Sequence, residues 1–457
     1  MELILIDWGT ISSNWLRRRL AYICMILLLN IVGISYFIYY LLANGYLPSP
    51  FIFDKSDTFM DFFNALHWAY DNGRYTEWGS VYPPLSFIIL RVINFVFAGG
   101  GFGDPSLMRD NSQWVILGIC LSYLLIPVLL LKTRYWRDFS YSEKLLIYFA
   151  IILSSPMLFT LERGNLILLA PILLALALSK IGMTRSVFIA LLINIKPYFA
   201  LLLIYYIARK NWKGFVNCAL MCGMIFTLFG LLLDNNFLIF FKNIFNFSQE
   251  EGLFSLREVM AMPSSISAFS YVLKHPDGAM FASGLLTQEK IALIVYTIEA
   301  AKWSVLAIAL IALFTKSKLI RDAEIFALLS VVISNLGIWV GGYTFILYVA
   351  LIPILIKMNA RWLYIGLISL MAIPLDIIPL LGDFIGRQYS YLANQRIEIF
   401  WTMGLGSVIR PIANLILLLS LSYEFLAKRN VCTYNNVVQH VCFFLGGSNM
   451  NYGFRDK

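Results

Sequence analysis

The chain has 457 residues, of which 60% are hydrophobic and 13% are charged, and its mean hydropathy is +0.76. Average soluble domains are about 45–50% apolar and about 25% charged, so this composition excludes a water-soluble globular protein and a disordered chain. The net charge of +9 does not by itself indicate nucleic acid, because Lys and Arg positions in a membrane protein first set its orientation. We therefore predict an all-α, polytopic integral membrane protein with no nucleic-acid partner.

Long apolar runs predict a series of membrane-spanning helices, each needing about 20 apolar residues. A further apolar stretch, residues 186–207, lies between two basic flanks. We predict a short hairpin there, broken at Lys196-Pro197, because proline interrupts a helix. Counting both arms of this hairpin gives about twelve helices. The other spans are expected at about 20–43, 114–131, 144–160, 164–180, 214–233, 290–315, 322–338, 343–357, 362–381 and 399–426.

Basic residues gather on one side of these predicted spans, starting with three arginines at 17–19. Cytoplasmic loops carry the excess of Lys and Arg in membrane proteins. We therefore expect both termini in the cytoplasm and the chain in a bacterial inner (plasma) membrane. The single membrane domain, 1–457, then has a first outer loop at 44–113, a second large outer loop at 234–289, and a cytoplasmic tail at 430–457.

The first outer loop carries the most informative stretch. Asp57 and Asp61 stand four residues apart, so they share one face of a helix. Asn72-Gly73 indicates the end of that helix, and Tyr82-Pro83-Pro84-Leu85 starts the next one. The segment 84–98 is short for a span and has Arg91 in its middle, so we predict an amphipathic helix on the outer surface.

Aromatic side chains accompany these carboxylates. The same loop contains His67, Tyr75, Trp78 and Tyr82. Rings that stack on sugar faces and acids that accept sugar hydroxyls together indicate a carbohydrate site. An aromatic belt at the membrane interface explains the tryptophans and tyrosines about equally well.

The order of these motifs resembles the GT-C class of membrane glycosyltransferases. The first span is followed by the Asp-bearing helix, then by Gly73-Arg74-Tyr75 and by Tyr82-Pro83-Pro84-Leu85. Further along, Arg163-Gly164-Asn165-Leu166 and Asn194-Ile195-Lys196-Pro197 resemble the Gly-Gln-x-Asn and Lys-Pro segments of glycosyltransferase family 87. Members of that family are mannosyltransferases that depend on polyprenol-phosphate-mannose. The motifs cover about residues 20–215.

The resemblance implies a GT-C-like fold and a catalytic aspartate at the start of the first outer helix, which maps best to Asp57. It also implies a hexose, mannose-like, that moves from a polyprenyl-phosphate carrier to a glycolipid or cell-surface polysaccharide on the outer side. Two positions depart from the family pattern: Asp61 stands where members often have Tyr, and Asn165 where the pattern has Gln. Either aspartate therefore remains a candidate base.

The residue types fit that reaction. A phosphate leaving group departs as an anion, so one carboxylate that takes the acceptor's proton is enough, and we expect no metal or other cofactor. Cations must stabilise the lipid phosphate, and the candidates are Arg163, Lys196, Arg74 and Arg91. The candidates for sugar or acceptor binding are His67, Tyr75, Trp78, Tyr82 and Asn165.

Two other functions share these features. A flippase or transporter of lipid-linked sugars would have similar spans and a broken hairpin, but it predicts paired internal repeats. A surface-polysaccharide polymerase would also carry long outer loops.

Overall fold

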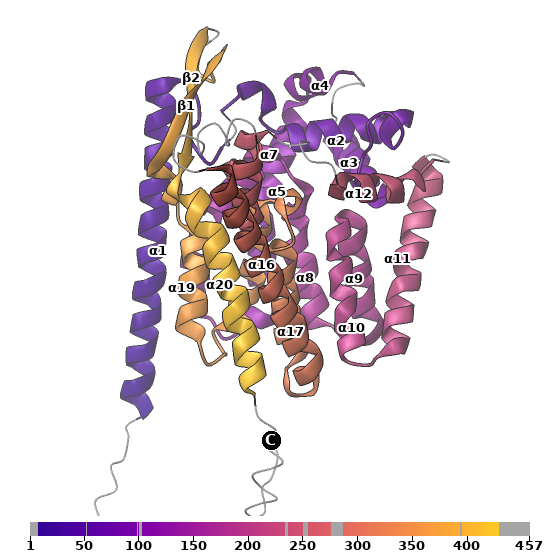
Figure 1. The fold of residues 1–457 in the computed structure, drawn as a ribbon, viewed down its shortest axis with the longest axis vertical. Helices are drawn as coiled ribbons and strands as arrows, with labels where there is room; N and C mark the ends of the chain where they lie inside the picture. Colours follow the sequence, from indigo (N-terminus) through magenta and orange to yellow (C-terminus); the bar gives the residue numbers. More distant parts are fainter. Residues whose placement is uncertain are drawn as a thin grey trace, which may run out of the picture.

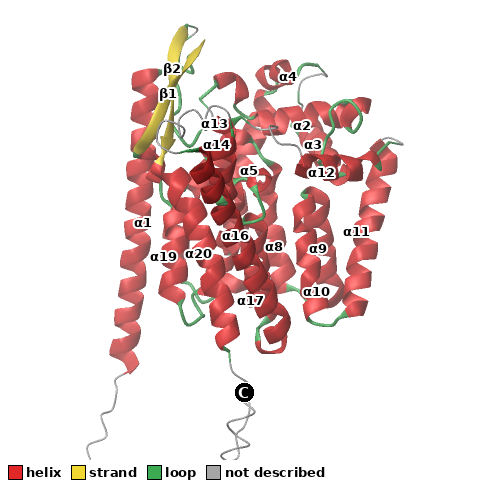
Figure 2. Cartoon of the chain, viewed as in Figure 1, coloured by secondary structure: helices red, strands yellow, loops and turns green. Residues whose placement is uncertain are grey.

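The computed structural model describes residues 8–51, 53–97, 99, 103–233, 236–249, 255–275, 287–393 and 395–428. The chain forms a bundle of helices (Figures 1 and 2), with two strands and several short helices gathered at one end. The beginning of α1 and the end of α20 lie at the opposite end. The predicted tail at 430–457 lies outside the described residues.

Five of the described helices are long and apolar enough to cross a membrane, and a bent pair makes a sixth. The long helices are α1 (Trp8–Asn44), α5 (Gln113–Leu131), α11 (Trp212–Leu233), α16 (Gln288–Lys316) and α20 (Leu405–Ala427). The bent pair consists of α6 (Tyr141–Ile152) and α7 (Ser155–Arg163), which meet at 54°. These helices make the chain a multi-pass membrane protein.

The remaining helices are shorter than the roughly 20 residues that a crossing needs, so the predicted total of about twelve spans is not confirmed. The shorter apolar α-helices are α3 (Pro84–Val96), α8 (Ala170–Ser179), α9 (Gly182–Ile195), α10 (Ile204–Ala208), α17 (Asp322–Ser334), α18 (Leu347–Leu355) and α19 (Arg361–Ala372). The other α-helices are α2 (Met60–Tyr70), α4 (Pro105–Asn111), α12 (Ile239–Gln249), α13 (Leu256–Ala261) and α14 (Ser267–Lys274). The 3-10 helices are η1 (Lys55–Asp57), η2 (Asn72–Arg74), η3 (Arg134–Trp136), η4 (Leu166–Leu169), η5 (Pro197–Leu203), η6 (Ser317–Leu319), η7 (Ile338–Val340), η8 (Gly342–Ile346) and η9 (Leu375–Ile377).

The predicted hairpin forms and is broken at the expected position. Helix α9 ends at Ile195, Lys196 has an extended backbone, and η5 begins at Pro197. Proline is tolerated there because the first turn of a helix needs no N–H donor. The hydroxyls of Ser186 and Tyr206 are 2.7 Å apart. The two arms therefore lie side by side, and both ends of the hairpin lie on the same side of the bundle.

The predicted all-α class is confirmed for most of the described chain. The exception is an antiparallel hairpin of β1 (Pro379–Tyr389) and β2 (Arg396–Gly404). The predicted spans 362–381 and 399–426 are corrected accordingly: α19 ends at Ala372 and α20 begins at Leu405. Proline at positions 374 and 379 ends the helical pattern. Along β2, buried Ile399 and Trp401 alternate with exposed Glu398 and Phe400, which is the period of a strand.

Part of the second outer loop is embedded in the bundle. The Asn414 side chain donates to the carbonyl of Ser264 at 2.8 Å, and the Ser407 hydroxyl donates to the carbonyl of Met260 at 2.6 Å. The Gly342 N–H donates to the carbonyl of Met262 at 2.7 Å. These bonds satisfy carbonyls that would be costly to bury alone, and they fix η8 beside the loop.

Candidate active site

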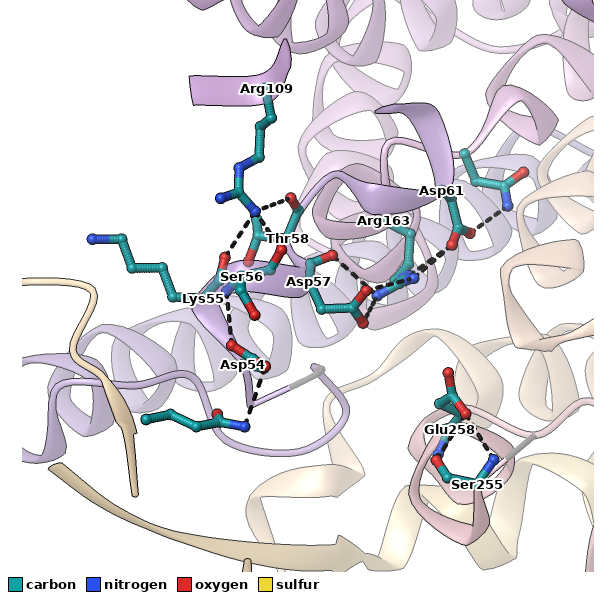
Figure 3. A network of polar contacts seen from close by, with 12 residues as sticks. Asp54, Lys55, Ser56, Asp57, Thr58, Asp61, Arg109, Arg163, Ser255 and Glu258 are labelled. Atoms are coloured by element: carbon teal, nitrogen blue, oxygen red, sulfur yellow. Dashed lines mark hydrogen bonds and ion pairs between the residues drawn. The ribbon is translucent and has the colours of Figure 1, made fainter. Parts of the chain in front are cut away.

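The two motif blocks that the sequence separates meet at one end of the bundle. Phe59, just before α2, has a left-handed backbone with φ of 64°, and its N–H donates to the carbonyl of Glu162 at 2.7 Å. This bond fastens the beginning of α2 to the end of α7. As a result, Asp57, the last residue of η1, and Asp61, in the first turn of α2, both face Arg163 (Figure 3).

Arg163 joins the two carboxylates. Its Nη1 is 2.5 Å from Oδ2 of Asp57, and its Nη2 is 2.6 Å from Oδ1 of Asp61. The Asn165 side-chain amide donates to the other oxygen of Asp61 at 2.7 Å. Both oxygens of Asp61 therefore have short bonds, whereas Oδ1 of Asp57 has, within the described structure, a single contact of 3.5 Å, to Nη2 of Arg163. The side chain of Asp57 is also the more exposed, at 31% against 21%.

The two carboxyl groups differ in proton affinity. Burial raises the pKa of Asp57 above its ordinary value, although Arg163 opposes the change. Burial acts in the same direction on Asp61, but Arg163 and the hydrogen bond from Asn165 outweigh it and lower the pKa of Asp61. The carboxylate with the higher pKa is the stronger base. The geometry and the proton affinities thus give the two aspartates different chemistry.

The structure explains why a glycine stands between Arg163 and Asn165. It ends α7 with φ of +64°, a left-handed conformation that favours glycine. A Cβ atom at this position would lie 3.0 Å from Cβ of Phe62, so a larger residue would also press on α2. Gly164 therefore lets the ends of α7 and α2 approach closely enough for Arg163 to reach both carboxylates.

The turn that carries Asp57 is held from two further sides. Arg109 of α4 donates through Nη1 to the carbonyls of Ser56 at 2.5 Å and Lys55 at 3.3 Å (Figure 3). From the β-hairpin, the Tyr391 hydroxyl is 2.5 Å from Oγ1 of Thr58. The sequence reasoning missed Arg109 and Tyr391, because no local pattern links residues so far along the chain to Asp57.

Lys196 supplies a cation that has no direct salt-bridge partner among the described residues. Its ammonium lies 4.0 Å from the centre of the Tyr82 ring, a cation–π contact. Among the described residues it has no hydrogen bond or ion pair, although it is near enough to Asp61 and Tyr343 to interact with them electrostatically. Tyr198 interacts in the same way with Tyr343 and Tyr82, and its buried hydroxyl has no hydrogen-bond partner in the described structure. Tyr198 and Tyr343 were also absent from the sequence prediction.

The other two predicted cations contact helix carbonyls. The fully buried Arg74 donates through Nε to the carbonyl of Trp68 at 3.0 Å, and Arg91 donates through Nε to the carbonyl of Ala69 at 2.8 Å. These carbonyls are in the last turn of α2, where positive charge is favourable. Arg74 and Arg91 therefore stabilise the end of α2 opposite to the carboxylates.

Three predicted sugar-binding residues make contacts within the first outer loop. Nδ1 of His67 is 2.8 Å from the carbonyl of Gly103, and Nε1 of Trp78 donates to a carboxylate oxygen of Asp71 at 3.0 Å. The buried Tyr75 donates its hydroxyl to the carbonyl of Tyr82 at 3.1 Å. Trp78 stacks on Trp68 but remains 47% exposed, whereas Tyr75 is buried.

The model of glycosyltransferase family 87 matches residues 81–334, which is more than half of the 457-residue chain. The matched region contains Arg163, Asn165 and Lys196, and it begins after the two aspartates. No curated protein and no solved structure matches the chain. On the family match, joined to a bundle of membrane-spanning helices, this chain belongs to glycosyltransferase family 87.

Proposed function

We propose that this membrane glycosyltransferase moves a mannose-like hexose from a polyprenyl-phosphate carrier to a glycolipid or cell-surface polysaccharide on the outer side of the membrane. The observation that carries the proposal is the pairing of two features. Asp57 is a partly exposed carboxylate with a raised pKa, and Lys196 is a cation without a hydrogen bond or ion pair among the described residues. The Asp57 carboxylate is suited to act as a general base, and the Lys196 ammonium is suited to bind the donor phosphate.

The reaction is a single displacement. The oxygen of the acceptor hydroxyl attacks the anomeric carbon, and the carboxylate of Asp57 takes the proton of that hydroxyl. The bond between the anomeric carbon and the phosphate oxygen breaks, and polyprenyl phosphate leaves with the electron pair. Because only one displacement occurs, the configuration of the anomeric carbon inverts. Asp61 is the weaker candidate for the base, since Arg163 and Asn165 occupy both its oxygens.

Lys196 is the best candidate for binding the donor phosphate. Arg163 has one positive charge and already faces two carboxylates, so its charge is fully balanced. Arg74 and Arg91 are directed to backbone carbonyls. A basic residue within a membrane protein is costly and by default indicates function, and a bound phosphate would give the Lys196 ammonium a direct partner. The tyrosines that interact electrostatically with Lys196 or with one another, Tyr82, Tyr198 and Tyr343, are candidates for further hydrogen bonds to the phosphate.

The test uses the purified full-length protein and synthetic polyprenyl-phosphate sugars, screened across hexoses and pentoses. We expect transfer from one class of donor, and an Asp57→Asn variant that folds but transfers poorly. If Asp57→Asn and Asp61→Asn both transfer sugar at the wild-type rate, the mechanism is wrong. Movement of labelled lipid across a bilayer without any transfer would instead favour a flippase, and repeated addition of whole saccharide units would favour a polymerase.

A further inference from the structure

A second feature of the bundle lies away from the aspartates. A cavity of about 150 Å³ is lined mainly by α1, α5, α6, α18 and α19 together with the beginning of α7. Its walls are almost entirely apolar, with Ile151, Ile352 and Ile368 among the lining residues. Apolar cavities of about 150 Å³ bind small hydrocarbons, so this one has room for part of a hydrocarbon chain.

The cavity is partly open to the surroundings, and α1 and α19 form two of its walls. A hydrogen bond of 2.8 Å between the hydroxyls of Tyr22 and Ser369 bridges these helices, and the rings of Tyr22 and Trp362 meet edge to face. All three residues line the cavity, and Trp362 is 48% exposed. Tyrosine and tryptophan are enriched where a membrane meets water, so this end of the cavity has the character of an interface.

Two arginines line the same end. Arg19 forms an ion pair with the buried Glu143, which balances its charge. Arg361, the first residue of α19, is exposed and has no hydrogen bond or ion pair to any described residue. Helix α19 has 12 residues, about 18 Å at 1.5 Å per residue, and its other end leads toward the β-hairpin (Figure 1). The excess positive charge therefore lies at the end of the bundle far from Asp57.

We infer that this cavity binds an acyl chain of an anionic phospholipid whose head-group phosphate contacts Arg361. The apolar walls fit the chain. The unbalanced guanidinium fits a head group whose phosphate charge is not balanced by an ammonium of the same lipid. Basic pockets between membrane helices are a known form of recognition of anionic lipids. With the orientation predicted from the basic residues, this lipid belongs to the cytoplasmic leaflet.

The polyprenyl chain of the proposed donor is the main competing occupant. In the proposed function the donor phosphate binds near Lys196. Only the hydrocarbon end of the polyprenyl chain could then reach Arg361, and that end has no charge or acceptor for the guanidinium. The lipid proposal does not depend on the identity of the donor or on the transfer mechanism, so either proposal can fail alone.

The experiment measures phospholipid bound to the purified full-length protein by native mass spectrometry. The protein is exchanged into detergent with phosphatidylglycerol or phosphatidylcholine of identical chains. We expect the wild type to retain phosphatidylglycerol at least fivefold better than phosphatidylcholine, and Arg361→Gln to abolish that preference. Lys318→Gln, which removes an exposed cation of η6 outside the cavity lining, is the matched control and should keep the preference.

A second variant tests the chain part of the site. Ala150→Phe, at a lining position on α6, should reduce retention of both lipids while leaving the head-group preference of any remaining lipid unchanged. Equal retention of the two lipids by the wild type would overturn the inference. So would displacement of phosphatidylglycerol by added polyprenyl phosphate with the same efficiency in wild type and Arg361→Gln, because that result would assign the cavity to the donor chain.

Discussion

Arg163 and Asp57 are 106 residues apart in the chain, and their side chains meet at 2.5 Å. The same guanidinium also binds Asp61 at 2.6 Å. A planar fork that contacts two carboxylates fixes their separation as well as their charge. The orientation of the proposed base therefore depends on a residue that contacts no substrate in the proposed reaction.

Replacement of each aspartate should separate their roles. Asp57→Asn removes the base and should lower kcat by about 10²–10⁴-fold, the usual contribution of such a group. Asp61→Asn keeps the base but weakens the anchoring of Arg163, so the loss of kcat should be smaller and the midpoint of thermal unfolding should fall. Initial rates and thermal unfolding in detergent measure the two effects. The assignment would be reversed if Asp61→Asn lost more activity while remaining equally stable.

The acid limb of the pH profile of kcat/KM should reflect the protonation of Asp57. A general base acts when deprotonated, so kcat/KM should fall as the pH drops through the pKa of Asp57, and burial places this limb above that of an ordinary aspartate. The charge of Glu258 also raises this pKa, so Glu258→Gln should move the limb to lower pH. Glu289→Gln, at the beginning of α16, should leave it in place. A limb that does not move in Glu258→Gln would contradict the role of Asp57.

Lys196 should determine the affinity for the donor. Loss of a charge-assisted hydrogen bond costs about 1.5–3 kcal/mol, so Lys196→Met should raise the KM for the polyprenyl-phosphate donor about 10- to 100-fold. The KM for the acceptor should change little. Lys213→Met, which removes an exposed cation at the beginning of α11, is the control. An unchanged donor KM in Lys196→Met would mean that the phosphate is bound elsewhere.

Arg109 should affect turnover without affecting substrate binding. Arg109→Ala frees the carbonyls of Lys55 and Ser56 and loosens the turn that carries the base, so kcat should fall about tenfold with little change in either KM. Arg109→Lys keeps one donor and should recover part of the loss. Steady-state kinetics of both variants, with Arg396→Ala on β2 as a surface control, measure the difference. Equal losses in the Ala and Lys variants would argue against a positioning role.

The predicted orientation can be checked by cysteine labelling in intact cells. A thiol reagent that does not cross the membrane should modify a cysteine introduced by Thr76→Cys in the first outer loop. It should spare one introduced by Arg134→Cys in the predicted cytoplasmic turn. Labelling of both positions after the membrane is opened is the control for reactivity. The reverse pattern in intact cells would place the aspartates on the cytoplasmic side.

Local signals were enough to predict part of this architecture. Apolar length located α1, α5 and α11 closely, and Pro197 located the break in the hairpin. The β-hairpin was not predicted because its apolar residues are numerous enough to resemble a span. Buried and exposed residues nevertheless alternate along part of β2, as they do in a strand.

The sequence predicted which residues form the candidate site more successfully than it predicted the contacts between them. Charge and motif order identified Asp57, Arg163 and Lys196, but a sequence without its fold does not say which cation meets which anion. Arg163 faces two carboxylates, whereas Lys196 has no hydrogen bond or ion pair among the described residues. Tyr391 and Arg109 reach the turn around Asp57 only through tertiary packing, so no spacing rule could have found them.

The contact between Thr58 and Tyr391 joins residues 333 positions apart. A ribosome adds about 5–20 residues per second. It therefore synthesises the turn around Asp57 on the order of tens of seconds before it synthesises Tyr391. During that interval the nascent chain carries the proposed base in an incompletely supported turn. Catalytic competence should consequently appear late in biogenesis, after the β-hairpin has folded against the first outer loop.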